Sequence, residues 1–329
     1  TGSDVPALPP CVVLTAGLGT RLRPLTWLRA KPALPVAGVP LVNRILAWLA
    51  SAGARRAVLN LHHLPGTIRA AVAGGAPRGL EIRYSFEDPI LGSAGGPKRA
   101  IALLDAPRVL VVNGDTLTDV DLGALLRAHD ESGALVTMAV VPNREPSRYG
   151  GVLAGDDGAV SGFAPRGERS AGSWHFVGVQ VVEAAAFERV PENQPSESVG
   201  ELYPRLVAER PGSVRAFRCD VGFHDIGTPA DYLATSIAMA GDDWSRLAGP
   251  RSAIGPGAEV SGSILWEDVT VGAGARVRGC IVTDGVSVAP GAVFAGQVLV
   301  SERHAAAIPA GSGARRHEGL LTFQLGDQR

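Results

Sequence analysis

The C-terminal part of the chain repeats itself with a period of 17 residues. Three consecutive lines start at Ala253, Thr270 and Ser287, and they read AIGPGAEVSGSILWEDV, TVGAGARVRGCIVTDGV and SVAPGAVFAGQVLVSER. Aliphatic residues return about every six positions, with Gly, Pro and Ala between them. A short repeat of this kind buries its apolar side chains only when neighbouring copies stack. We therefore expect triangular coils whose aliphatic corners point inward and lie above one another.

These coils resemble the hexapeptide-repeat left-handed parallel β-helix, which we predict over residues 250–303. Residues 304–329 are polar and Gly-rich, and the sequence assigns no element to this tail. In hexapeptide acyltransferases the β-helix is the catalytic part and uses a histidine base between its coils. None of the seven histidines lies from Ala253 to Val300, which favours a structural or oligomer-forming β-helix. A homo-oligomer is expected, because three coils leave open ends that a second subunit could cover.

Residues 8–245 alternate short β-branched runs with longer amphipathic stretches, the pattern of β/α units around a parallel sheet. We predict an α/β domain with a Rossmann-like mixed, mostly parallel sheet sandwiched by helices. The strands are expected at Cys11–Thr15, Ala57–Leu61, Leu80–Ser85, Arg108–Asn113, Leu135–Val141 and Phe176–Val182. The helices are expected at Pro40–Ala52, Leu122–Ser132 and Pro229–Ala240, with Thr228 as the N-cap of the last one.

Composition limits the partners of the chain. Its formal net charge is -1, so no summed field attracts nucleic acid or an anionic membrane. No apolar run approaches the roughly 20 residues that a membrane span needs, and the N-terminus lacks a basic-then-apolar signal. The three cysteines are far apart and form no CxxC pair, which suits reduced packing thiols in a cytoplasmic protein.

A glycine loop follows the first strand, at the strand end where open α/β sheets bind their ligands. It reads Ala16-Gly17-Leu18-Gly19-Thr20-Arg21. Two glycines let backbone N–H groups approach phosphate oxygens closely, and Arg21 adds a charged fork. The loop lacks the Gly-Lys-Ser/Thr end of a Walker loop and has Leu22 where a dinucleotide fingerprint has Gly or Ala. A P-loop NTPase and a Rossmann dehydrogenase are therefore disfavoured.

A lysine follows this loop at the start of Lys31-Pro32-Ala33-Leu34-Pro35-Val36. The chain has only two lysines, Lys31 and Lys98, against an abundance of arginine. A lysine beside a phosphate loop indicates that a compact point charge is needed there. We interpret Lys31 as a phosphate ligand; the alternative is a solvated surface lysine.

The run GLGTRLRPLT followed by KPALPV resembles the signature of the sugar nucleotidyltransferases, the enzymes that make GDP-mannose, dTDP-glucose, UDP-glucose and ADP-glucose. The resemblance implies an enzyme that joins a nucleoside triphosphate to a sugar 1-phosphate and releases pyrophosphate. The implied catalytic residues are Arg21, Lys31 and Asp115. The triphosphate contacts would fall on Ala16, Gly17, Gly19, Thr20, Arg21 and Lys31.

Two aspartates match the metal positions of that family. Asp115 ends the run VLVVNGD, which also contains Asn113, a predicted nucleotide contact. Asp225 lies in FHDIGTP before the last predicted helix. Mg²⁺, the cofactor that we expect, is usually held by a small number of carboxylates together with substrate oxygens. The alternatives are a strand-end turn for Asp115 and a helix-entry cap for Asp225.

The segment Leu91-Gly92-Ser93-Ala94-Gly95-Gly96 resembles the family element that lies against the base and ribose of the nucleotide. Gly92 and Ser93 are therefore predicted nucleotide contacts, although a Gly-rich turn taken alone is a weak signal. Glu87 precedes this segment and could accept hydrogen bonds from a guanine edge. Its alternative is an ordinary surface carboxylate.

On the sugar side, Tyr149 and Gly150 resemble the YG element of the family, whose glycine backbone faces the sugar. Arg166 stands where many relatives have the lysine of a Glu-Lys pair, and it could clamp the sugar phosphate. Pro165 cannot replace the hydroxyl-binding glutamate of that pair, which leaves the sugar open. Gly178 and Glu201 are expected to complete the pocket, with a structural role as the alternative for each.

Two rival functions and several substrates stay open from the sequence. Asp119-Val120-Asp121 fits the metal motif of a glycosyltransferase, but it also fits a helix-entry turn. A non-catalytic regulatory homologue is the second rival. The segments LGSAGG and NGDTLTDVDL resemble those of relatives that handle mannose, heptose or muramic acid phosphates, and this resemblance favours GTP with a mannose-like phosphate. The alternative is UTP with a sugar phosphate such as N-acetylmuramate 1-phosphate.

Overall fold

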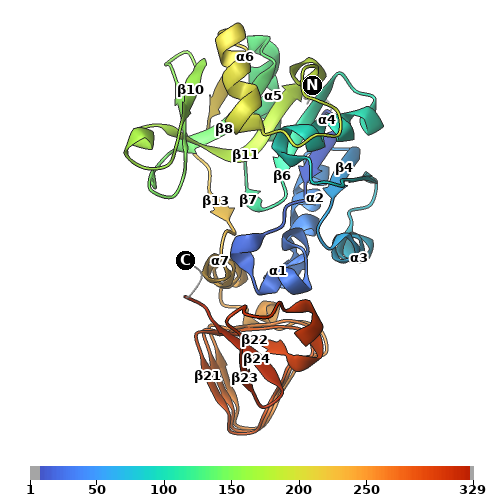
Figure 1. The fold of residues 1–329 in the computed structure, drawn as a ribbon, viewed down its shortest axis with the longest axis vertical. Coiled ribbons are helices and arrows are strands. Elements are labelled where there is room, and N and C mark those ends of the chain that lie inside the picture. The colour runs from blue at the N-terminus through green and yellow to red at the C-terminus, as the bar shows by residue number, and fades with distance from the viewer. Residues whose placement is uncertain (1–7, 327–329) are drawn as a thin grey trace, which may run out of the picture. The chain divides into compact units, whose positions relative to one another are not determined.

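A computed structural model describes residues 8–326, which form two compact units (Figure 1). The first, here called the sheet unit, comprises residues 8–17 and 42–224. The second, here called the coil unit, comprises residues 18–41 and 225–326. The predicted first domain, residues 8–245, thus contributes to both units. The chain passes from one unit to the other three times: inside the glycine loop, between Leu41 and Val42, and between His224 and Asp225.

The sheet unit is built on a nine-stranded sheet with the path β10-β9-β11-β6-β1-β4-β5, to which β8 is added beside β11 and β12 beside β8. Neighbours from β6 to β5 run parallel, as do β8 and β12, whereas β11 is antiparallel to both β6 and β8. The predicted mixed, mostly parallel sheet is confirmed. The strands are β1 (Cys11–Leu14), β4 (Arg56–Leu61), β5 (Glu81–Phe86), β6 (Arg108–Asn113), β8 (Val136–Pro142), β9 (Gly151–Ala154), β10 (Val160–Ala164), β11 (Trp174–Glu183) and β12 (Val214–Arg218), and the short β7 spans Thr116–Thr118.

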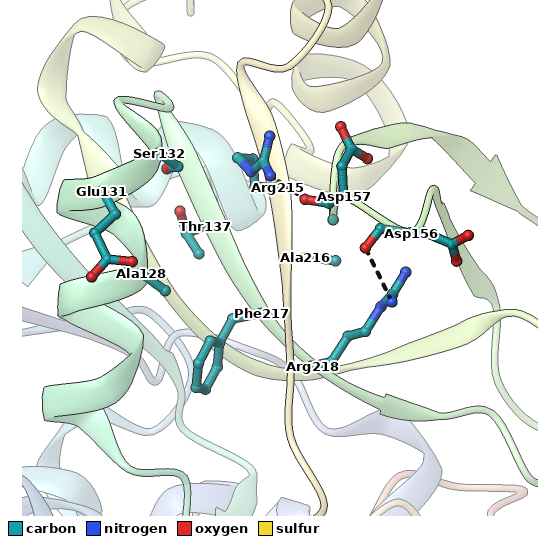
Figure 2. Close-up of a pocket in the computed structure, with 11 residues that line it drawn as sticks. Ala128, Glu131, Ser132, Thr137, Asp156, Asp157, Arg215, Ala216, Phe217 and Arg218 are labelled. Atoms are coloured by element: carbon teal, nitrogen blue, oxygen red, sulfur yellow. Dashed lines mark hydrogen bonds between the residues drawn. The ribbon is translucent and has the colours of Figure 1, made fainter.

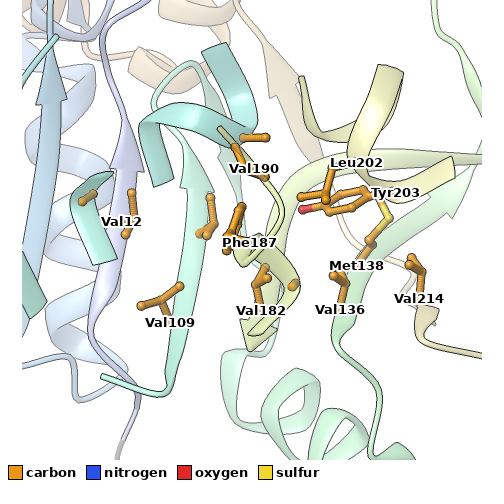
Figure 3. Packing of buried hydrophobic residues seen from close by; sticks show 14 of the residues in the cluster. Val12, Val109, Val136, Met138, Val182, Phe187, Val190, Leu202, Tyr203 and Val214 are labelled. Atoms are coloured by element: carbon orange, nitrogen blue, oxygen red, sulfur yellow. The ribbon is translucent and has the colours of Figure 1, made fainter. Parts of the chain in front are cut away.

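The core of the sheet unit lies between this sheet and its helices. The four central residues of β6 are valine or leucine and are at most 1% exposed, as expected for a strand covered on both faces. Figure 3 shows Val109 of this strand, Val182 of β11 and Phe187 in one buried cluster. Aligned parallel strands place the carboxyl ends of β1, β4, β5, β6 and β8 at one edge, where the ligands of such sheets bind.

The helices of this part of the chain are α2 (Leu41–Ser51), α3 (Pro65–Gly75), α4 (Gly92–Leu104), α5 (Leu122–Ser132) and α6 (Tyr203–Glu209). The prediction for α5 is confirmed in its bounds. The sequence does not reveal α4, because it begins with Gly-Ser-Ala-Gly-Gly and contains Pro97. Glycine and proline have low helix propensity, so neighbouring structure must stabilise this helix.

The coil unit contains the predicted stack of three coils. Strands of successive coils pair in parallel exactly one repeat apart, as Ala253 with Thr270 and Thr270 with Ser287. The inward side chains of Val271 and Val277 are fully buried. The strands are β14 (Ala253–Ile254), β15 (Glu259–Ser261), β16 (Ile264–Leu265), β17 (Thr270–Val271), β18 (Arg276–Arg278), β19 (Ile281–Val282), β20 (Ser287–Val288), β21 (Val293–Ala295) and β22 (Gln297–Ser301).

The tail that the sequence left without an element extends one face of these coils. Strand β24 (Leu320–Gln324) pairs antiparallel with β22, and β23 (Arg315–His317) pairs with β24. Residues 327–329 of the predicted tail lie outside the described residues. The ring of Phe323 in β24 lies 6.2 Å from the ring of Trp27, so the tail also packs on the N-terminal segment of the coil unit.

That segment, residues 18–41, contains α1 (Leu25–Leu28) and the hairpin β2–β3 (Pro35–Val36 and Val39–Pro40). Tyr232 of α7 (Pro229–Ala240) donates its hydroxyl to the carbonyl of Pro35 at 2.5 Å. The predicted N-cap of α7 is confirmed: Thr228 accepts from the backbone N–H of Asp231 and forms a capping box with it. The last short strand, β13, spans Phe223–Asp225. Among residues 8–326 no helix has the length and apolar character to cross a membrane.

Candidate active site

A buried amide fixes the start of the glycine loop in the sheet unit. Asn60, at 3% exposure, accepts from the backbone N–H of Thr15 at 2.6 Å and of Ala16 at 3.3 Å. Its amide nitrogen donates to Glu87 Oε1 at 2.7 Å. The other oxygen of Glu87 accepts from the backbone N–H of Leu91 at 2.8 Å. One buried pair therefore holds both the loop after β1 and the entry to α4.

These hydrogen bonds give Glu87 a structural role that the sequence did not reveal. Glu87 is only 3% exposed, so it is not a surface carboxylate. A Cβ on Gly96 would lie 2.6 Å from Glu87 Oε1, which explains a glycine at that turn of α4. Direct contact of Glu87 with a base stays a prediction. The partner Asn60 was missed, although an asparagine inside the apolar strand RAVLNL was a signal.

Asp115 follows a close contact between β6 and β1. The backbone N–H of Gly114 donates to the carbonyl of Leu14 at 2.9 Å, and a Cβ on Gly114 would lie 2.4 Å from that oxygen. Only glycine fits such an approach. Leu14, the last residue of β1, pairs with Asn113, the last residue of β6. The half-buried Asp115 therefore lies two residues beyond the end of β6, next to the start of the glycine loop.

Gly178 lies against Asn113 at the same edge of the sheet. Its φ is +81°, and a Cβ there would lie 2.8 Å from both Cβ and Nδ2 of Asn113. The pairing of β11 with β8 shifts register between Phe176 and Gln180, so Gly178 sits in an irregularity of β11. Two predicted ligand residues from distant motifs are thus in contact, and the glycine is required by that contact.

The entry of α4 is bound to a segment near residue 197. Ser93 Oγ donates to Glu197 Oε2 at 2.5 Å, and the backbone N–H of Ser198 donates to Ser93 Oγ at 2.8 Å. Gly92 has a φ of +74°, and a Cβ there would lie 2.7 Å from Glu197 Oε1. Glu201 accepts from the backbone N–H of Glu197 at 3.3 Å. Glu197 is an exposed carboxylate that sequence reasoning missed, and Glu201 caps the turn that presents it.

In the coil unit, Lys31 lies beside the second half of the glycine loop. Gly19 has a φ of +59°, and its carbonyl accepts from Thr26 Oγ1 at 2.8 Å. A Cβ on Gly19 would lie 2.8 Å from Thr26 Cγ2 and 3.4 Å from Lys31 Cβ. Lys31 is 9% exposed and is therefore not a solvated surface lysine. The two motifs of the resemblance meet within this unit.

Arg21 lies next to the segment that carries Asp225. A Cβ on Gly227 would lie 3.1 Å from Arg21 Nη1 and 3.2 Å from Asp231 Oδ2. Asp231 is engaged in the capping box of α7, and Asp225 is half-buried two residues before Gly227. The cation of the glycine loop and the second predicted metal aspartate therefore belong to neighbouring segments of the coil unit.

Tyr149 borders a cleft of about 140 Å³ at the carboxyl end of β8. Its ring lies 4.1 Å from the ring of His175, which lies 4.9 Å from the ring of Phe223. Burial lowers the pKa of His175 to about 4, so this imidazole is neutral at pH 7. The amide of Asn143 donates to the carbonyls of Tyr149 and Gly150 at 3.3 and 3.5 Å and holds the YG element in place.

Arg166 is exposed in the turn after β10. A Cβ on Gly150 would lie 3.1 Å from the carbonyl oxygen of Ala164 and 3.9 Å from the backbone nitrogen of Arg166. The predicted sugar-side residues Tyr149, Gly150 and Arg166 therefore lie on adjoining backbone segments.

A second cleft of the sheet unit, of about 340 Å³, contains none of the predicted site residues (Figure 2). Its two arginines, Arg215 and Arg218, donate to backbone carbonyls of the turn at Asp156 and Asp157. The two guanidinium groups therefore hold that turn in place, and we propose no ligand for this cleft.

The geometry also bears on the rival metal motif. Asp121 Oδ1 accepts from the backbone N–H of Ala124 at 2.8 Å and caps α5, which is the helix-entry role. Across residues 8–326, no group of three or more His, Cys, Asp or Glu side chains is placed to hold a metal ion.

The family model described as nucleotidyl transferase matches residues 11–240. The chain belongs to the nucleotidyl transferase family. This range contains every predicted site residue, from Ala16 to Asp225. A second model, described as the GlmU-like C-terminal hexapeptide, matches residues 242–303 and agrees with the stacked coils of the structure.

Two curated relatives and one solved structure illustrate the likeness. A mannose-1-phosphate guanylyltransferase of Mycobacterium tuberculosis is 31% identical over 76% of this nucleotidyltransferase and 73% of its own length. A UTP–glucose-1-phosphate uridylyltransferase of Synechocystis is 28% identical over 79% and 71% of the two chains. The crystal structure of HddC from Yersinia pseudotuberculosis has a TM-score of 0.63 at 23% identity and covers 70% of this chain and 100% of its own, a likeness of fold.

Proposed function

We propose that this nucleotidyltransferase joins GTP to a mannose-like sugar 1-phosphate, giving a GDP-sugar and pyrophosphate. The observation that carries the proposal is the buried Lys31 beside the left-handed Gly19 of the glycine loop. Lysine is a compact point charge, and beside a glycine loop whose backbone can approach phosphate oxygens it suits the triphosphate that a nucleotidyl transferase uses. The guanylyltransferase relative supports the choice of nucleotide and sugar.

In the proposed reaction an oxygen of the sugar phosphate attacks the α-phosphorus of GTP. A new P–O bond forms as the bond to the departing pyrophosphate breaks. No general base is needed because the attacking phosphate is already an anion. Arg21, Lys31 and the N–H groups of the loop from Ala16 to Thr20 would bind the triphosphate, orient it and offset its charge. The nucleotide would also contact Asn113, Gly92 and Ser93.

Magnesium is the proposed cofactor, with Asp115 and Asp225 as its protein ligands. Carboxylate oxygens suit a hard cation, and Mg²⁺ is commonly held by one or two carboxylates together with water and substrate phosphates. That donor set fits a chain whose described residues include no larger cluster of metal-binding side chains. When bound, the ion would supply positive charge to the phosphate oxygens.

The sugar phosphate is proposed to contact Tyr149, Gly150, Arg166, Gly178 and Glu201. Arg166 would clamp the phosphate as a bidentate donor. A neutral His175, whose ring lies 4.1 Å from that of Tyr149, suits a pocket for an uncharged sugar ring. UTP is the second candidate nucleotide, because the uridylyltransferase relative is 28% identical over a similar span.

The experiment is a pyrophosphate-release assay of GTP, UTP, ATP and dTTP against a panel of sugar 1-phosphates. The highest kcat/KM is expected for GTP with a mannose-like phosphate, and Lys31→Gln should remove most of it. Arg99→Gln is the matched control, because Arg99 is a cation on the exposed side of α4. A preference for UTP would replace GTP by the second candidate, and no release with any pair would refute the enzymatic proposal.

We also propose that the protein forms a homo-oligomer through its coils. Val293 on the last coil is 68% exposed and Ile254 on the first coil is 38% exposed, so apolar side chains of the coils are available to a second subunit. Light scattering of wild type and Val293→Glu tests this, and a monomeric wild type would refute it.

A further inference from the structure

Arg29, two residues before Lys31, is held by acidic side chains of the coils. Its Nε and Nη2 donate to the two carboxylate oxygens of Asp284 at 3.0 and 2.8 Å, a bidentate pair. Nη2 also donates to Glu267 Oε1 at 3.0 Å, and the guanidinium lies 5.1 Å from the ring centre of Trp266. The side chain of Arg29 is 20% exposed, so the pair is shielded from solvent more than a surface pair.

The two acceptors occupy the same position in consecutive coils. Leu265 pairs with Val282, so Glu267 and Asp284 are stacked one repeat apart. Asp284 Oδ1 also accepts from the backbone N–H of Glu267 at 3.1 Å. Asp284 is therefore tied to the backbone of the neighbouring coil as well as to Arg29, and a fixed acceptor can position its donor.

Apolar packing does not fill the space around Arg29. A cleft of about 470 Å³ in the coil unit is bordered by Arg29, by the hairpin that contains Pro35, and by Trp266 of the first coil. The hydrogen bond from Tyr232 to Pro35, supported by Trp266 Nε1 at 3.0 Å from the tyrosine oxygen, holds the far side of that hairpin. These polar contacts add to the apolar packing of the segment, in which Leu25 and Leu34 are fully buried.

The connection from Arg29 to Lys31 is short and stiff. The backbone N–H of Arg29 donates to the carbonyl of Leu25 at the end of α1. Lys31 begins the next helical turn, in which the backbone N–H of Leu34 donates to the carbonyl of Lys31 at 3.1 Å. Two residues span at most about 7 Å, so a shift of Arg29 is transmitted to Lys31.

From this geometry we infer that Arg29 and Asp284 are positioning residues for Lys31: the coils hold the phosphate-binding lysine in place through one bidentate ion pair. The inference rests on the proposed role of Lys31. It gives the coils a part in the reaction within a single chain, in addition to any part in assembly.

The first test measures activity in a double-mutant cycle. Asp284→Asn should lower kcat for pyrophosphate release about tenfold, because small misplacements of a binding group are amplified in rate. In a Lys31→Gln background the same substitution should change kcat less than twofold, since residues that act through each other are not additive. Equal losses in both backgrounds, or a normal kcat in Asp284→Asn, would overturn the inference.

Glu259→Gln is the matched control. Glu259 is an exposed carboxylate of the first coil that pairs with Arg278 at 3.0 Å, so its loss should leave kcat unchanged. If Asp284→Asn lowers the melting temperature so far that it does not fold, Arg29→Lys replaces it. Lysine keeps the charge but cannot form the bidentate pair.

The second test does not depend on turnover. Because the chain has only two lysines, acetylation of Lys31 and Lys98 by acetic anhydride can be followed separately by peptide mass spectrometry. Asp284→Asn should increase the labelling rate of Lys31 at least threefold and leave Lys98 unchanged. Unchanged labelling of Lys31 refutes the positioning role, whereas a wild type that turns over no substrate pair refutes the proposed function alone.

Discussion

The amide of Asn60 donates to the carboxylate of Glu87 across 2.7 Å, and each side chain is only 3% exposed. Asn60 lies near the carboxyl end of β4, and Glu87 directly follows the last residue of the parallel strand β5. On one side the pair accepts from the first N–H groups of the glycine loop, and on the other from the entry of α4. The backbone of both predicted nucleotide elements thus depends on one buried polar contact.

Asn60→Ala should destabilise the protein and weaken nucleotide binding. The substitution removes the acceptor for Thr15 and Ala16 and leaves the buried Glu87 with one donor fewer, a loss of about 1–3 kcal/mol in the free energy of unfolding. Urea denaturation measures the stability, and the KM for the nucleoside triphosphate should rise several-fold. Glu81→Ala on the exposed end of β5 is the control. An Asn60→Ala protein with wild-type stability and KM would contradict this account.

Gly114→Ala should disrupt the edge of the sheet that carries Asp115. Its Cβ would lie 2.4 Å from the carbonyl oxygen of Leu14, so β6 and β1 must separate. We expect a loss of about 1–3 kcal/mol in unfolding free energy and little remaining turnover. Gly66→Ala in α3 is the matched control: no atom lies within 4 Å of its Cβ, and a helical alanine should be neutral or stabilising. Comparable losses in both variants would show that the close contact is unimportant.

The secondary elements with strong periodicity could be predicted from the sequence, whereas their contacts could not. The bounds of β6, α5 and α7 match the apolar runs and the caps, and the register of the coils follows the repeat. Asn60 and Glu87 are 27 residues apart, and Arg29 and Asp284 are 255 apart. Nothing local in the chain encodes such pairs, because they exist only after the sheet and the coils have formed.

The motifs predict residues of the candidate site, but they do not predict the contacts that hold those residues. Gly114 looks like an ordinary loop glycine in the sequence, and only the packed structure reveals that a Cβ there would meet the carbonyl oxygen of Leu14. The grouping of residues 18–41 with the coils was equally hidden, because it depends on contacts with segments more than 180 residues later in the chain. The close approach of two backbones depends on tertiary packing and cannot be predicted from composition.

The stability of the protein should fall as the pH is lowered from about 6.5 to about 4. Burial lowers the pKa of His175 to about 4, below the 6.5 of an exposed histidine, so the unfolded chain binds the extra proton in that interval. Burial also lowers the pKa of His129, which acts in the same direction. His175→Gln should reduce the slope of unfolding free energy against pH in this window, and the exposed His317→Gln should not. Identical slopes in wild type and His175→Gln would exclude this histidine as a cause.

Removal of divalent cations should abolish turnover and spare the fold. With excess EDTA we expect no pyrophosphate release, full recovery on adding Mg²⁺, and an unchanged melting temperature, because the carboxylates are assigned to substrate chemistry rather than to folding. Asp115→Asn and Asp225→Asn should each lower kcat by several orders of magnitude. Asp121→Asn is the control, since its carboxylate caps α5: it should lose about 1 kcal/mol of stability at most and keep its response to Mg²⁺. Near-normal turnover of Asp115→Asn would remove this residue from the proposed magnesium ligands, and full activity in EDTA would remove the metal itself.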